Sequence, residues 1–159
     1  MKLMFTFLTA LFLFFQTPDL ENLRNSYSKA NNSVENTKAF IDLAESKNSQ
    51  DPVIKGYQAA AKILEAKVSK KGRPALVKSG ATQLENIIKE HPENIELRLI
   101  RLSVQENIPK IVGYNSALKT DKNFILSQYS KQNAALKSHI RKFAAQSKTM
   151  TAAEKNALR

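Results

Sequence analysis

Residues 93–105 read ENIELRLIRLSVQ, and this stretch decides what kind of fold the chain can form. Its apolar residues recur at helical spacing, but they occupy two sides of the helix instead of a single stripe. The two sides consist of Ile95, Leu99 and Leu102, and of Leu97, Ile100 and Val104. A helix that is apolar on two sides has to be covered on both. We therefore expect residues 93–105 to form a central helix that is enclosed by others.

The segments on both sides of this central helix are also typical of helices. Residues 51–68 have the clearest start, because Asp51 suits an N-cap and Pro52 suits the first helical position. No segment alternates between apolar and polar residues for long enough to predict a strand. Further helices are expected at residues 19–31, 34–47, 74–90 and 121–143, with a short helical or irregular piece at 110–118. The sequence therefore predicts an all-α fold of about six helices.

The first residues of the chain are typical of a secretory signal peptide. Lys2 is followed by an uncharged, apolar run of 13 residues from Leu3 to Phe15. A membrane-spanning helix needs about 20 such residues, so the alternative is an uncleaved interfacial anchor. The chain has no cysteine, so core packing must hold the exported protein without disulfides. We expect a signal peptide at residues 1–17 and a periplasmic or secreted mature protein.

The mature part of the chain is short enough to form one domain. We expect a single helical domain at residues 18–146, followed by a frayed basic tail at residues 147–159.

Residues 80–99, GATQLENIIKEHPENIELRL, carry a pattern of small, large apolar and proline residues. Gly80, Leu84 and Pro92 stand where the junction between two tetratricopeptide repeats has these residue types, so the segment resembles that family. The resemblance implies a stack of antiparallel helix hairpins. The chain departs from the family at Ile87, where an alanine is usual.

The residues available for catalysis do not form a recognisable apparatus. His91 and His139 are the only histidines, and neither has a carboxylate at a metal-ligand spacing on its helix. No signature of a nucleophile or of a phosphate-binding loop is present. We expect no enzyme activity, no cofactor and no metal. Residues 70–74, KKGRP, resemble the core of a DNA-binding hook, but a solvated loop is the expected role and nucleic acid is not an expected partner.

Two arginines on the central helix point to a candidate partner-binding site. They lie one turn apart, and an aromatic and an amide residue follow in the next glycine-marked loop. Arginines on an enclosed helix must reach solvent or pair, and the available partners are Glu65, Glu85 and Glu106. The alternative is a groove that accepts a partner's carboxylate. The candidate residues are Arg98, Arg101, Tyr114 and Asn115.

The net charge of the chain is concentrated in its last third. Residues 19–107 hold 14 basic and 12 acidic residues, whereas residues 108–159 hold 10 and 2. A basic amphipathic helix can bind an anionic membrane surface. The alternative is a core-packed helix with a lysine-rich solvent face. The candidate residues for an anionic surface are Lys131, Lys137, Arg141 and Lys142.

The sequence as a whole predicts a non-catalytic exported protein that binds or scaffolds a protein partner. The alternative is a peripheral envelope protein held by its basic C-terminal helix.

Overall fold

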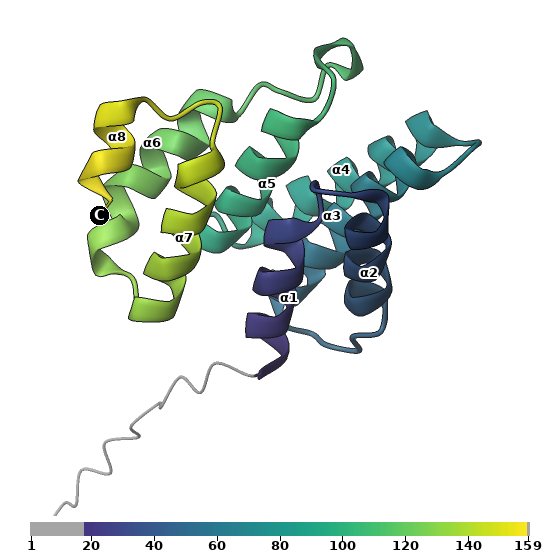
Figure 1. Cartoon of the computed structure of the whole chain (residues 1–159), viewed down its shortest axis with the longest axis horizontal. Helices are drawn as coiled ribbons and strands as arrows, with labels where there is room; N and C mark the ends of the chain where they lie inside the picture. The colour runs from purple at the N-terminus through teal and green to yellow at the C-terminus, as the bar shows by residue number, and fades with distance from the viewer. Residues whose placement is uncertain (1–17, 159) are drawn as a thin grey trace, which may run out of the picture.

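The computed structural model describes residues 18–158, and this part of the chain is all α-helical, without a strand (Figure 1). Within it lie eight α-helices, more than the six or so expected, and two 3-10 turns. In chain order they are α1 (Pro18–Lys29), α2 (Val34–Glu45), α3 (Pro52–Val68), α4 (Arg73–Glu90), α5 (Ile95–Asn107), η1 (Lys110–Val112), α6 (Leu118–Gln128), η2 (Tyr129–Lys131), α7 (Ala134–Gln146) and α8 (Ala152–Ala157).

The central position of α5 is confirmed. In Figure 1, α5 lies between the α1–α4 group and the α6–α8 group. Two clusters of buried apolar residues meet at this helix, one on each side. Leu97, Ile100 and Val104 belong to the cluster of α1–α4, and Ile95, Leu99 and Leu102 belong to the cluster of α6–α8. The two apolar sides seen in the sequence are therefore the two core faces of α5.

The first cluster is organised around three aromatic rings. Tyr27, Phe40 and Tyr57 are buried, and their ring centroids lie 5.0–6.3 Å apart in tilted and edge-on arrangements. These three rings join α1, α2 and α3. The predicted start of α3 is confirmed, because Asp51 Oδ1 accepts hydrogen bonds from the backbone N–H groups of Val53 and Ile54 at 2.7 and 3.2 Å.

The second cluster corrects the expectation of one long helix at residues 121–143. The chain instead forms α6 and α7, with η2 between them. The backbone turns because Gln132 is extended and Asn133 caps α7, accepting a hydrogen bond from Leu136 N–H at 2.9 Å. Asp121, expected to begin this helix, is instead a fully buried residue inside α6.

The segment after α7 is packed against the domain and not frayed. Thr151 and Glu154 form a capping box at the start of α8. Met150 and Leu158 are buried in the second cluster. Tyr129 Oη donates a hydrogen bond to the carbonyl oxygen of Leu158 at 2.7 Å. Residues 147–158 therefore belong to the helical domain.

The expected signal peptide, residues 1–17, lies outside the described residues. Among residues 18–158, no helix combines the length and the apolar character needed to cross a bilayer.

A buried ion pair joins the first helix to the central one. The Arg24 guanidinium donates to both carboxylate oxygens of Glu96, at 2.7 and 2.5 Å, and both side chains are almost completely buried. Tyr57 Oη donates to Glu96 Oε1 at 2.8 Å. Because a buried charge is stable only when it is paired, this carboxylate fixes α1 and α3 against the start of α5.

Substitution of Glu96 should destabilise the protein strongly. We expect Glu96→Gln to reduce the free energy of unfolding by about 3–5 kcal/mol, because the Arg24 charge stays buried without its counter-charge. Urea denaturation followed by circular dichroism measures this change. Glu93→Gln, at an exposed position in the preceding turn, is the control and should change stability by less than about 0.5 kcal/mol. Equal effects of the two substitutions would contradict this account of the ion pair.

Candidate functional site

Two of the predicted partner-binding residues are engaged in an ion cluster within the protein. Arg101 donates to both carboxylate oxygens of Asp121 at 2.7 Å, and its third nitrogen donates to Glu85 at 2.6 Å. Arg98 donates to Asp121 at 3.2 Å, and its guanidinium carbon lies 4.3 Å from the Phe124 ring centroid. Glu85 was among the expected partners, whereas Asp121 was missed.

Tyr114 joins the same cluster. Its hydroxyl donates to Glu85 Oε1 at 2.7 Å, and burial together with this hydrogen bond raises the pKa of the tyrosine well above its usual value. Asn115 lies half-buried beside it in the loop before α6. Asp121 and Glu85 therefore accept the hydrogen bonds that Arg98, Arg101 and Tyr114 would otherwise donate to a partner's carboxylate.

The four basic residues of the predicted anionic surface do not lie on one continuous helix. Lys131 is in η2, whereas the other three are on α7. Lys137 lies 5.7 Å from the Tyr129 ring centroid, and Arg141 donates a hydrogen bond to the Tyr129 hydroxyl at 2.9 Å. Lys142 lies 3.5 Å from the side-chain oxygen of Asn25. The apolar side of α7 packs into the second cluster, so these basic residues lie on the outer surface of the packed helices α6 and α7.

His139 is a buried member of the Arg24–Glu96 network. Its Nε2 atom lies 3.1 Å from the Tyr57 hydroxyl, which donates its own proton to Glu96. His139 Nε2 is therefore the donor in that contact. Burial is the main reason that the pKa of His139 falls to about 4, with Arg24 and Lys142 also lowering it and Glu96 opposing them. At neutral pH the ring is a neutral hydrogen-bonding residue in the core.

The other histidine, His91, lies exposed in the turn after α4. Within residues 18–158 no three His, Asp or Glu residues are grouped so that they could hold a metal ion.

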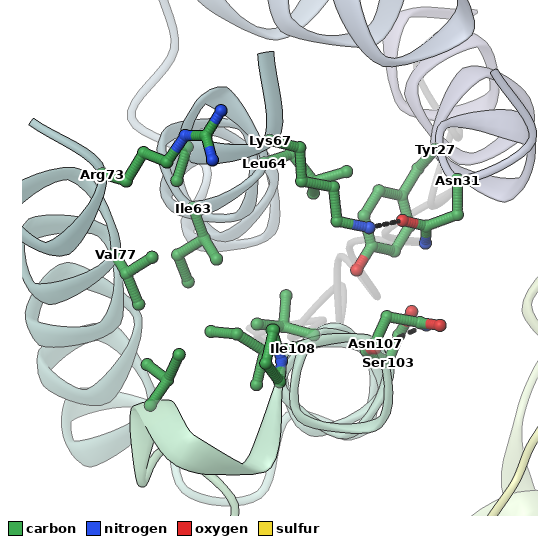
Figure 2. Close-up of a pocket in the computed structure, with 14 residues that line it drawn as sticks. Tyr27, Asn31, Ile63, Leu64, Lys67, Arg73, Val77, Ser103, Asn107 and Ile108 are labelled. Carbon is green, nitrogen blue, oxygen red and sulfur yellow. Dashed lines mark hydrogen bonds between the residues drawn. The ribbon is translucent and has the colours of Figure 1, made fainter. Parts of the chain in front are cut away.

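The feature that sequence reasoning missed is an apolar cleft of about 360 Å³ (Figure 2). Its walls come from the end of α1, the last turns of α3, the start of α4, the end of α5 and the segment that follows α5. Ile63 and Leu64 of α3, Val77 of α4 and Ile108 after α5 surround the space, as Figure 2 shows. We call this feature the apolar cleft. The residues come from separate parts of the chain, so no single stretch of sequence indicates it.

Cationic side chains lie at the edge of the apolar cleft. Arg73 and Lys67 line it, and no aspartate or glutamate is among the described lining residues. Lys67 donates a hydrogen bond to the side-chain oxygen of Asn31, and Arg73 Nε donates to the Ser69 carbonyl oxygen at 2.7 Å. Burial, and to a smaller extent the nearby Lys148 ammonium, lower the pKa of Lys67. The edge of the cleft is therefore electropositive.

The 3-10 turn η1 adds exposed apolar surface beside the cleft. Val112 lines the cleft and is 43% exposed, and the neighbouring Ile111 is 96% exposed. The turn is closed by Gly113, whose φ of 74° is in the left-handed region that favours glycine. Ile111 and Val112 extend the apolar surface of the cleft, and an exposed apolar patch of this kind is a feature of interaction surfaces.

Comparison with known proteins gives no relative: no family model, no curated protein and no solved structure matches this chain.

The buried histidine makes a pH-dependent contribution to stability. Because the folded protein binds the His139 proton less readily than the unfolded chain, this contribution is complete above pH 6.5 and is lost as the pH falls to about 4. We expect a loss of the order of 3 kcal/mol from this group. Urea titrations across this range, on the wild type and on His139→Gln, measure the difference. An equally steep loss of stability in the variant would show that His139 is not responsible.

The ion cluster around Asp121 should behave as a structural element. We expect Asp121→Asn to reduce the free energy of unfolding by about 3 kcal/mol, because Arg98 and Arg101 lose the charge that they share. Thermal and urea denaturation measure this effect, with the exposed Asp42→Asn as the control. If Asp121→Asn leaves the free energy of unfolding nearly unchanged, the result would contradict a structural role and favour these arginines as a binding site for an external anion.

Proposed function

We propose that this chain is a non-catalytic protein-binding module, and that its apolar cleft receives a segment of a partner protein. The observation that carries the proposal is the cleft with the exposed residues Ile111 and Val112 at its edge. Burial of apolar surface is the main driving force of protein association. A volume of about 360 Å³ is also in the usual range for binding pockets, about 300–1,000 Å³.

A protein partner fits this surface better than a small ligand would. Ile111 does not line the cleft, so a molecule that fills the cleft alone would leave this side chain in water. A partner segment that enters the cleft and also covers η1 would bury both surfaces. This location differs from the one expected at Arg98, Arg101, Tyr114 and Asn115.

The tetratricopeptide-like hairpin arrangement also remains a proposal. Its support is the close packing of α4 on α3 at Gly80, where an added Cβ atom would lie 2.6 Å from the Ala59 carbonyl oxygen. A small residue at this point is required for two helices to approach in this way, as the resemblance implies. We also propose export from the cytoplasm with removal of residues 1–17, and its support is the apolar run of residues 3–15 after Lys2.

Site-specific photo-crosslinking tests the proposed function. We expect a photo-reactive phenylalanine analogue at position 111 of the full chain to form discrete adducts with protein in envelope extracts of the native host. Ala135, exposed at the start of α7, is the control position and should give none. Adducts at position 111 should disappear in the Val77→Trp background, because the indole occupies the cleft. Adducts that persist with the cleft filled, or that form equally at position 135, would contradict the proposal.

Binding to an anionic membrane surface is the competing function, and liposome co-sedimentation tests it. The apolar residues Leu136, Ile140 and Ala144 of α7 are packed in the second cluster, so this helix has little apolar surface left to enter a bilayer. We expect residues 18–159 to remain in the supernatant with anionic vesicles at physiological salt. Sedimentation that is lost when Lys137 and Arg141 are replaced by glutamine would favour the membrane function.

A further inference from the structure

We infer that the segment received by the apolar cleft is acidic as well as apolar, with bulky apolar side chains for the cleft and at least one carboxylate for Lys67 and Arg73. The inference rests on the proposed function and specifies the chemistry of the partner.

The apolar requirement follows from the walls of the cleft. Ile63, Leu64, Val77 and Ile108 present aliphatic side chains to the space between α3, α4 and α5 (Figure 2). Polar backbone or side-chain groups placed against such walls would lose their hydrogen bonds to water without compensation. The part of the partner that enters the cleft must therefore be apolar.

The acidic requirement follows from the placement of the cations. Figure 2 shows the Arg73 side chain reaching from the start of α4 to the end of α3, at the upper left of the space, and the Lys67 ammonium at its upper right. Lys67 also lies in the field of Lys148, whose ammonium is near enough to contribute to the lowered pKa of Lys67. A carboxylate placed beside Lys67 would relieve the repulsion that Lys67 experiences from Lys148, and could form charge-assisted hydrogen bonds with Lys67 and Arg73.

The cations at the cleft differ from those of the ion cluster on α5, because the described part of the chain provides no carboxylate for them. We therefore expect this carboxylate to come from the partner. Arg98 and Arg101 are neutralised by Asp121 and Glu85, at 2.6–3.2 Å. No described acidic residue lines the cleft, and the hydrogen bonds given above for Lys67 and Arg73 go to neutral oxygens. The chain therefore supplies carboxylates to Arg98 and Arg101, and neutral oxygens to Lys67 and Arg73 at the edge of the apolar cleft.

The net charge of the whole chain favours the same partner. The chain carries a formal net charge of +11 at neutral pH. Such a charge raises the rate of encounter with an acidic partner, and this effect weakens as salt screens it.

Selection from a display library of random peptides of about 12 residues, a length typical of a single recognition segment, tests the inference. The full mature chain is the bait, in four parallel selections. These are the wild type, Val77→Trp to fill the cleft, the pair Lys67→Gln and Arg73→Gln to remove its charges, and Lys131→Gln with Lys137→Gln as a control of equal charge. Circular dichroism and thermal denaturation confirm that each bait is folded.

We expect the wild type and the control bait to enrich peptides that combine Leu, Ile or Phe with Asp or Glu. Synthetic copies of these peptides should bind about tenfold more weakly to the bait without the cleft charges, measured by fluorescence anisotropy at low salt. They should not bind to Val77→Trp.

The possible failures are distinguishable. Peptides that depend on the cleft but are neutral or basic would overturn the inference and leave the proposed function standing. Enrichment that is the same with Val77→Trp, or no enrichment at all, would overturn both. Stoichiometric binding of dodecanoate in the cleft, with no peptide enriched, would also overturn both and identify a small anionic amphiphile as the ligand.

Discussion

The fold depends on the pairing of the charged side chains that α5 carries into the interior. Glu96 is buried at the start of this helix and Arg101 one and a half turns later, so each needs a counter-charge from another helix. Arg24 of α1 supplies one, and Asp121 of α6 supplies the other. The first pair connects α5 to the α1–α4 group, and the second connects it to the α6–α8 group.

This arrangement also determines where the apolar cleft lies. The two ion pairs involve the first two turns of α5, whereas the cleft is at the other end of the helix, beside Ser103, Val104 and Asn107. There the chain leaves α5 at Ile108 and forms η1, so within residues 18–158 no further helix covers the gap between the end of α3 and the start of α4. An open cleft supported by rigid helices is suited to binding without a large rearrangement.

The elements predicted well from the sequence were those with a local physical signal. The two apolar sides of α5 and the Asp51–Pro52 start of α3 each follow from neighbouring residues, and both are confirmed. The break between α6 and α7 has such a signal in Asn133, but the apolar stripe that runs across it predicts one helix. Its two halves pack into the same cluster after the chain reverses, which is why the stripe continues across the break.

The candidate site was less accessible to sequence reasoning. The sequence offers Glu65, Glu85 and Glu106 as partners for the two arginines, and Glu85 is the one that pairs with Arg101. The sequence predicts Asp121 only as the start of a helix, because its role as a buried counter-charge depends on how α6 packs on α5. The cleft is formed by separate elements, and its lining residues are ordinary helix residues in each of them. The exposure of Ile111 likewise becomes visible only in the folded chain.

Native-state hydrogen exchange tests the central claim most directly, which is that the ion pairs of α5 make residues 18–158 a single cooperative unit. The account predicts that the most protected amides of α3, α5 and α7 exchange with the same free energy of opening, within about 1 kcal/mol, and that this value equals the global free energy of unfolding. Exchange of α6, α7 and α8 through a separate opening of much lower free energy, with α1–α5 still protected, would contradict it.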